Sequence, residues 1–162
     1  MEDNENKIKV MIVDDEYLER ILISKIFDYE KNGLEIIGDY KNGKEAISAY
    51  IMNPADIILV DINMPILNGL ELSQKIKEVN SNAEIIIISG FNDFEYAKTA
   101  IKIGVRNYLL KPINKNELEE SLIQSKNNIM LQRDLEKIYN ENVSNKRIGH
   151  IIPLWHDMSI FI

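Results

Sequence analysis

The sequence predicts a doubly wound α/β fold, in which helices cover both faces of a five-stranded parallel sheet. Five short apolar runs, rich in β-branched residues, alternate with five segments whose apolar residues recur at helical spacing. The runs are apolar almost throughout, which is typical of strands that are buried on both faces. No internal repeat or low-complexity segment interrupts the alternation.

The predicted strands are short and end at polar residues or turns. In chain order they are residues 8–13, 34–40, 56–62, 84–89 and 106–110. Each segment between or after them carries an apolar stripe, typical of the helix face that packs on a core. The stripes are Leu18, Ile21, Leu22, Ile26 and Tyr29; Ala46, Ile47, Tyr50 and Ile51; Leu72, Ile76 and Val79; Ala97, Ala100 and Ile101; and Leu118, Leu122, Ile123 and Ser125.

The composition excludes several classes of function. The 162 residues suffice for one ordinary domain with a short appendage. There is no cysteine, and the two histidines, His150 and His156, lie near the end, so thiol chemistry and a histidine-built site are disfavoured. No apolar run approaches the length of a transmembrane helix, and the polar N-terminus does not resemble a signal peptide, so we expect a cytoplasmic location. The net charge of −7 argues against direct binding of nucleic acid.

Polar side chains follow four of the five predicted strands. In a doubly wound sheet, ligand sites lie beyond the carboxyl ends of the strands, so these side chains are expected at one edge. They are Asp14, Asp15 and Glu16 after the first strand, Asp61 at the end of the third, Ser89 ending the fourth, and Lys111 with Pro112 after the fifth. Taken singly, each has an ordinary explanation as a helix cap, a turn residue or a strand exit. Their convergence favours a shared site.

The residue types at this edge suit phosphoryl transfer. Clustered carboxylates repel one another, and Mg²⁺ relieves that repulsion because it accepts one or two carboxylates and keeps other positions open. The Asp61 carboxylate can attack phosphorus, while Lys111 adds positive charge and the Ser89 hydroxyl donates a hydrogen bond to the new phosphoryl group. No general base is needed, because a carboxylate is already ionised at neutral pH.

Four short motifs extend this interpretation. They are "VDDE" (13–16), "DINMPILNG" (61–69), "ISG" (88–90) and "LLKPI" (109–113). In order and spacing they resemble the receiver domain of two-component response regulators, over residues 7 to about 128. The resemblance implies a flavodoxin-like receiver fold with strand order 2-1-3-4-5, followed here by an extended C-terminal helix.

The resemblance also implies a role for each acidic residue. Asp61 takes the position of the phosphoacceptor, which receives its phosphoryl group from a sensor histidine kinase. Asp15 is expected to bind Mg²⁺ directly and Asp14 mostly through water, with Asp61 and the backbone carbonyl of Asn63 completing the protein's ligands. Apart from taking phosphate from a donor and losing it again, the chain is not expected to be an enzyme.

Three further residues match the family's switch. Ser89 takes the position of the switch hydroxyl, Lys111 that of the phosphate-binding lysine, and Tyr108 that of the switch aromatic residue. The Lys111–Pro112 bond is expected to be cis, a form that is accessible chiefly before proline. Phosphorylation is expected to reshape the face of the fourth helix, fifth strand and fifth helix, and to promote a homodimer.

A finer resemblance concerns the output. Residues 89–113 look like receivers that are joined to AraC-type helix-turn-helix domains, which implies regulation of transcription. The residues after the receiver, 129–162, are too few for such a pair of helix-turn-helix units and lack its pattern. We therefore expect output through a DNA-binding domain that is missing or truncated here. The alternative is a stand-alone receiver that acts by protein–protein interaction.

We expect three parts along the chain: a disordered N-terminus (1–6), a receiver domain (7–128), and a linker-helix extension with a tail of unknown role (129–162). Residues 114–141 indicate one long helix, whose apolar spacing continues past the receiver at Leu131, Leu135 and Ile138. A solvated helix and a short coiled coil between protomers are both compatible with this spacing. For the apolar final residues, a docked tail, a truncated linker and an artefact are equally open.

Other classes share parts of this pattern. A flavodoxin-like cofactor domain needs a loop that cradles phosphate after the first strand, where Asp14, Asp15 and Glu16 would repel it. A phosphatase with an aspartyl intermediate usually carries a second acid two residues after the nucleophile, whereas this chain has Asn63 there. A degenerate receiver that never accepts phosphate is disfavoured because no key position is missing.

Overall fold

The computed structural model describes the backbone of residues 7–156 and the side chains up to residue 146. Residues 1–6, predicted to be disordered, and 157–162, the end of the predicted tail, lie outside the described residues. The strands are β1 (Ile8–Val13), β2 (Leu34–Tyr40), β3 (Ile57–Val60), β4 (Glu84–Ser89) and β5 (Asn107–Leu110). The helices are α1 (Tyr17–Ile26), the short 3₁₀ helix η1 (Glu30–Asn32), α2 (Gly43–Met52), α3 (Gly69–Val79), α4 (Phe94–Ile103) and α5 (Lys115–His156).

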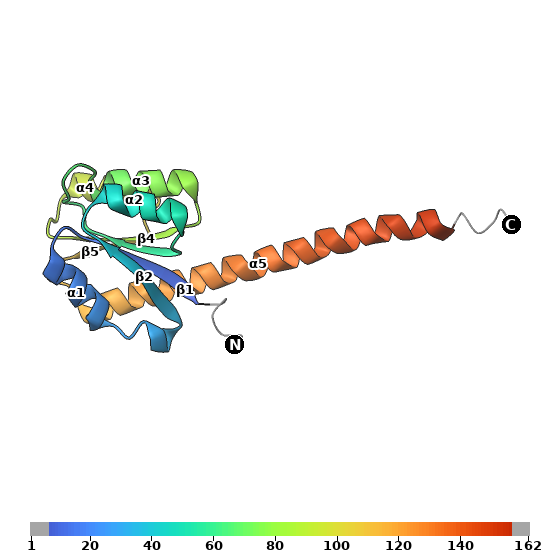
Figure 1. Cartoon of the computed structure of the whole chain (residues 1–162), viewed down its shortest axis with the longest axis horizontal. Helices are drawn as coiled ribbons and strands as arrows, with labels where there is room; N and C mark the ends of the chain where they lie inside the picture. Colours follow the sequence, from blue (N-terminus) through green and yellow to red (C-terminus); the bar gives the residue numbers. More distant parts are fainter. Residues whose placement is uncertain (1–6, 157–162) are drawn as a thin grey trace. The chain divides into compact units, whose positions relative to one another are not determined.

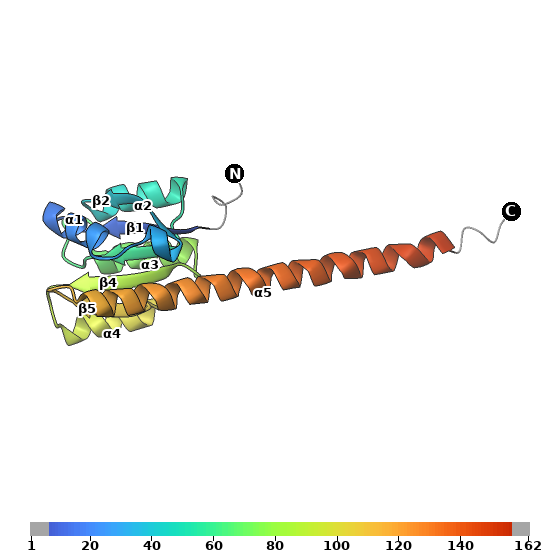
Figure 2. The same cartoon turned by 90° about the horizontal axis from the view of Figure 1, so that it is seen from below.

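The five strands form one parallel sheet in the order β2-β1-β3-β4-β5. This arrangement confirms the predicted fold class and strand order. Figures 1 and 2 show α1 and the beginning of α5 on one face of the sheet, and α2, α3 and α4 on the other. Helices therefore cover both faces of the three central strands. This explains why the sequences of these strands are mainly apolar and do not alternate between apolar and polar residues.

The core on the α2–α4 side is built from every second residue of the strands. Met11 and Val13 of β1, with Ile58 and Val60 of β3, belong to one buried cluster. The helices contribute Tyr50, Leu72, Ile76 and Ala100 to the same cluster. These four residues come from the predicted stripes of the second, third and fourth helices. The outer members of those stripes, Ile51, Val79 and Ile101, are exposed instead.

The predicted stripe of α1 is wrong in its orientation. Leu18 is 77% exposed and Ile21 and Leu22 are also exposed, whereas Ile23 is buried. The reason is Arg20, whose guanidinium donates hydrogen bonds to Asp39 Oδ1 (2.7 Å) and to the carbonyl of Asp14 (2.8 Å). These bonds turn Arg20 towards the sheet, and the apolar row at 18, 21 and 22 therefore faces outwards.

Several predicted boundaries also shift. The 56–62 strand is reduced to Ile57–Val60, and the 106–110 strand begins at Asn107. Tyr29 lies outside α1 but is buried, and its ring contacts Phe27 edge-on. The helix predicted over 114–141 begins at Lys115 and continues to His156, well into the segment expected to be a tail.

The chain divides into two compact units, with the boundary between Lys126 and Asn127. The first unit holds the sheet, helices α1 to α4 and the start of α5, and the second is the remainder of α5 with the residues after it. Within the described residues, no helix is both long enough and apolar enough to span a membrane.

The loop between β3 and α3 folds back tightly on the end of β3. The amide of Gly69 donates to the carbonyl of Ile62 (2.9 Å), and Asn68 caps α3 through a reciprocal pair with Glu71. This closure brings Gly69 so near to Asp61 that a Cβ atom at Gly69 would collide with the Asp61 carbonyl oxygen. The start of α3 therefore lies directly against Asp61, the residue that follows β3.

We expect Gly69→Ala to destabilise the protein, because the added methyl group meets backbone atoms that cannot rotate away. Overpacking of this kind costs about 1–3 kcal/mol of the free energy of unfolding, measured here by urea denaturation. Gly90→Ala is the matched control, since nothing lies within 4 Å of a Cβ at that position. Equal unfolding midpoints for the two variants would contradict the close approach of Gly69 to Asp61.

Candidate functional site

Backbone hydrogen bonds between neighbouring strands hold the predicted residues at the carboxyl edge of the sheet. The amide of Asp14 donates to the carbonyl of Tyr40 (3.0 Å), and that of Asp61 donates to the carbonyl of Val13 (2.9 Å). The amide of Lys111 donates to the carbonyl of Ser89 (2.8 Å). The backbone hydrogen bonds of the sheet thus continue one residue past the apolar strands. They fix the backbone positions of Asp14, Asp61 and Lys111.

The ammonium of Lys111 brings the site together. Its Nζ donates a hydrogen bond to Asp14 Oδ2 at 2.9 Å and lies 3.6 Å from Asp61 Oδ1. A third carboxylate, that of Glu16, is 3.9 Å away. The side chains of Asp14 and Asp61 are only 1% and 5% exposed, so little water screens these interactions. Lys111 therefore interacts with carboxylates that follow β1 and β3.

The charge balance at this edge remains negative. Burial raises the pKa of the Asp61 carboxyl to about 6; the charge of Lys111 opposes this shift, while Asp14 and Asp15 add to it. Burial would lower the pKa of Lys111, but the hydrogen bond to Asp14 and the charge of Asp61 outweigh it, and the pKa is raised. One lysine thus compensates the buried carboxylates only in part.

The acidic residues after β1 fit a divalent cation. Carboxylate oxygens of Asp14, Asp15 and Glu16 lie within 4.8 Å of one another, and Asp15 and Glu16 are exposed. Both oxygens of Asp14 already have partners, since Oδ1 accepts from the Glu16 amide (2.9 Å) and Oδ2 from Lys111. Hard oxygen donors beside a carboxyl of raised pKa are the environment that Mg²⁺ suits. Asn63 lies on the exposed loop after β3, and its carbonyl as a ligand stays a prediction.

The predicted switch residues are connected through Phe91, a residue that the sequence did not single out. Ser89 is fully buried, and its Oγ accepts a hydrogen bond from the Phe91 amide (3.2 Å). The hydroxyl of Tyr108 donates to the Phe91 carbonyl (2.8 Å), while the Phe91 ring is exposed. The Lys111–Pro112 peptide bond is cis, as expected. The backbone of Phe91 therefore joins Ser89 to Tyr108.

Two charged residues near the site were also missed. Arg20 binds the carbonyl of Asp14 and so supports the first strand end from α1. Glu16 was recognised only as part of an acidic run, yet it lies beside Lys111. An arginine between the apolar positions of α1 was a signal available in the sequence. Nothing in the sequence indicated the role of Phe91, because it acts through its backbone.

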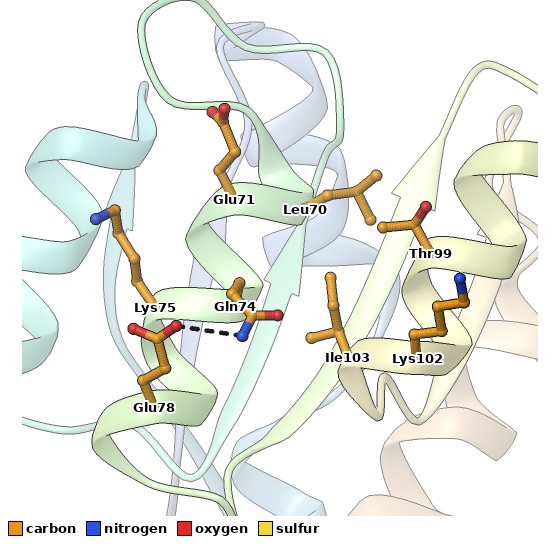
Figure 3. A pocket seen from close by; sticks show the side chains of 8 residues that line it. All are labelled: Leu70, Glu71, Gln74, Lys75, Glu78, Thr99, Lys102 and Ile103. Carbon is orange, nitrogen blue, oxygen red and sulfur yellow. Dashed lines mark hydrogen bonds between the residues drawn. The ribbon is translucent and has the colours of Figure 1, made fainter.

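A separate groove of about 530 Å³ lies between α3 and α4. Figure 3 shows Leu70 and Ile103 between charged side chains of the two helices, with Gln74 hydrogen bonded to Glu78 on α3. The remaining lining residues are Glu71, Lys75, Thr99 and Lys102. None of the residues predicted at the strand ends lines this groove, so it is separate from the acidic site.

Residues 10–123 match the response regulator receiver domain, and the matched segment includes the entire acidic edge. The chain belongs to the response regulator receiver family. This finding confirms the resemblance that the four motifs indicated. The strand order β2-β1-β3-β4-β5 is that of the receiver fold.

The relatives that this chain matches differ in how much of their own length the match covers. The transcriptional regulatory protein YesN of Bacillus subtilis is 34% identical over 143 residues, which cover 88% of this chain but 36% of YesN. The chemotaxis protein CheY of Thermotoga maritima is 33% identical, and the match covers 70% of this chain and 93% of CheY. The chain thus spans about a third of YesN but nearly all of this CheY.

A solved structure shows the same arrangement. The receiver domain of AraT, a response regulator from Geobacillus stearothermophilus, is 32% identical and superposes with a TM-score of 0.73. The match covers 78% of this chain and 98% of the AraT domain. A two component transcriptional regulator AraC from Clostridium phytofermentans is 27% identical with a TM-score of 0.68, over 80% of this chain and 99% of that one. This match supports the finer resemblance to receivers of AraC-type regulators.

We expect Asp61→Asn to stabilise the metal-free protein at neutral pH, because it removes a buried charge that is only partly compensated. The native carboxyl has a pKa raised from 3.8 to about 6, so its proton stabilises the fold at low pH and this contribution is lost as pH rises through 6. The free energy of unfolding of Asp61→Asn should exceed that of the parent by about 1–3 kcal/mol at pH 7.5, and the difference should vanish near pH 4.

Urea denaturation in the presence of a chelator measures both values across this pH range. Asp134→Asn, an exposed position on α5, is the matched control and should follow the parent at each pH. A difference between Asp61→Asn and the parent that is constant from pH 4 to pH 7.5 would refute this account of Asp61.

Proposed function

We propose that this receiver accepts a phosphoryl group on Asp61 from a sensor histidine kinase, in a step that depends on Mg²⁺. The observation that carries the proposal is the partly compensated carboxylate of Asp61, buried at the sheet edge with Lys111 at 3.6 Å and the acidic cluster after β1 beside it. A buried carboxylate beside a cation is a nucleophile that is held in place and needs no base.

The chemistry balances as a displacement at phosphorus. A carboxylate oxygen of Asp61 forms the new P–O bond, and the bond between phosphorus and the donor breaks, with its electron pair leaving on the donor. Lys111 neutralises part of the charge that accumulates on the phosphoryl oxygens. When bound by Asp14, Asp15, Asp61 and the Asn63 carbonyl, Mg²⁺ supplies further positive charge and orients the phosphoryl group.

The same geometry supports a limited catalytic role. The chain takes phosphate from a donor and loses it by hydrolysis, and we do not propose turnover of external substrates. Asn63 follows Asp61 by two positions, where a phosphatase with an aspartyl intermediate usually has a second acid. An amide there cannot transfer a proton to a leaving group as a carboxylic acid can.

We propose that Ser89, Phe91 and Tyr108 convert phosphorylation into a conformational change. Phosphorylation adds up to about two negative charges near the Ser89 hydroxyl. The Ser89 Oγ accepts from the Phe91 amide, and its hydrogen can donate to the phosphoryl group. If Ser89 turns towards the phosphoryl group to do so, its Oγ moves away from the Phe91 amide and frees the loop whose carbonyl holds Tyr108. The face of α4, β5 and the start of α5 then changes its packing and supports a homodimer.

The output that the comparisons support is regulation of transcription. YesN is a transcriptional regulatory protein, and this chain matches about a third of its length. We therefore propose that this receiver controls a DNA-binding domain. Action as a stand-alone receiver through protein–protein contacts is the second candidate, supported by the match to nearly the whole of a CheY. Sequencing of the reading frame beyond residue 162 distinguishes the two.

The phosphoacceptor assignment predicts that acetyl phosphate with Mg²⁺ adds one phosphoryl group to the chain, and that hydroxylamine removes it. Intact-mass spectrometry should show this gain in the parent but not in Asp61→Asn. Asp93→Asn, which alters an aspartate at the start of α4, is the matched control and should gain phosphate as the parent does. Equal phosphorylation of Asp61→Asn and the parent would show that another residue is the acceptor.

The metal assignment predicts that Asp15→Asn weakens Mg²⁺ binding by at least about tenfold, because a direct carboxylate ligand is lost. Isothermal titration of unphosphorylated protein measures this affinity without any phosphoryl transfer. Asp28→Asn, an exposed aspartate after α1, should bind Mg²⁺ like the parent. An unchanged affinity in Asp15→Asn would exclude Asp15 as a ligand, while leaving the phosphoacceptor assignment to its own test.

A further inference from the structure

The second compact unit carries a row of exposed apolar side chains. Leu131, Leu135 and Ile138 of α5 are 59%, 57% and 55% exposed. Their spacing of four and then three residues places them on one stripe of the helix. Exposed leucine and isoleucine on a single stripe are favourable only when another apolar surface covers them.

The row fits a heptad repeat with polar residues at some core positions. In the heptad abcdefg, Leu135 takes position a, and Leu131 and Ile138 take position d. The next a position is Asn142, which is also exposed. An asparagine at a core position favours a two-stranded parallel pair in register, because each amide then faces the same amide of the other helix. Asn142 therefore follows the apolar row as a core asparagine that favours this kind of partner; the next d position, Asn145, is also polar and exposed.

The flanking charges agree with a partner that is identical to the helix itself. Glu141 takes position g and Lys146 takes position e of the following heptad, and both are exposed. In a parallel pair in register, position g of one helix lies beside this e position of the other. Within one helix, residues five apart do not face each other, so the two charges complement each other only between helices.

We propose that residues 128–146 of α5 pair with the same residues of a second copy of this chain as a parallel two-stranded coiled coil. Leu131, Leu135 and Ile138 form its apolar core, Asn142 sets its register, and Glu141 pairs with Lys146 of the second copy. This inference goes beyond the proposed function, because a dimer held in this way requires neither phosphate nor the face of α4 and β5.

The absence of cysteine from the sequence makes disulfide crosslinking a clean test. Leu135→Cys and Asn142→Cys each place a single thiol at a core position, one heptad apart. In full-length protein without phosphodonor, both variants should form covalent dimers under mild oxidation, measured on non-reducing gels. Asn140→Cys is the matched control: it replaces the same residue type two positions earlier but takes position f, on the outer side of the pair, and should crosslink poorly.

The outcomes separate the alternatives. The two thiols are about 10 Å apart along the helix axis, so an antiparallel pair can join at most one of them to itself. Crosslinking of only one core variant would therefore overturn the parallel arrangement. If neither core variant exceeds Asn140→Cys, α5 is a solvated helix here and the proposal fails.

Charge reversal tests the register independently. Lys146→Glu places two glutamates beside each other at each of the two g–e contacts, and the dissociation constant from sedimentation equilibrium should rise roughly tenfold. Glu141→Lys should weaken the dimer similarly, and the double variant should restore it. Lys137→Glu, the same change at the outer position c, should have little effect. A double variant as weak as the two single changes combined would refute the pairing of Glu141 with Lys146.

Discussion

The site depends on one ammonium group placed among carboxylates. Lys111 contacts Asp14 at 2.9 Å and Asp61 at 3.6 Å, and both acids are almost completely buried. Without Lys111, two carboxylates would lie in a medium of low dielectric, a cost that ordinarily drives one of them to take up a proton. With it, Asp61 still has a pKa near 6. Lys111 therefore offsets part of the negative charge of the buried carboxylates. The negative charge that remains is an environment that suits a divalent cation.

The position of this site follows from the way the sheet is buried. The central strands are covered on both faces, so their sequences are mainly apolar, with Lys9 and Glu84 as exceptions, and the polar groups of the site lie where the strands end. Parallel strands all end at the same edge, and the backbone bonds of Asp14, Asp61 and Lys111 continue the ladder there. Residues separated by up to 97 positions are thus brought into contact by the requirement to bury the strands.

Most of the fold and the charged centre of the site could be predicted from the sequence, because both rest on regular spacing. Continuous apolar runs indicate strands buried on both faces, a period of 3.6 residues indicates helices, and strand ends mark the edge of the sheet. The orientation of α1 could not be predicted in this way, since the half-buried Arg20 faces the sheet while three apolar residues remain exposed. The connection through Phe91 was hidden because it uses backbone atoms, which every residue possesses.

Under the proposed function, the free energy of switching comes from a difference between two states in the hydrogen bonds and charges at the site. In this structure, Lys111 is closer to Asp14 than to Asp61, and the Ser89 Oγ accepts a hydrogen bond from the Phe91 amide. A phosphoryl group on Asp61 would offer charged acceptors to the Lys111 ammonium and to the hydroxyl hydrogen of Ser89, and charge-assisted hydrogen bonds are the stronger kind. Because the Lys111 amide is bonded to the Ser89 carbonyl, the two donors start from the same pair of strand ends. Their side chains can turn together while the backbone bonds of the sheet are kept, so the proposed change starts at the loop that holds Tyr108.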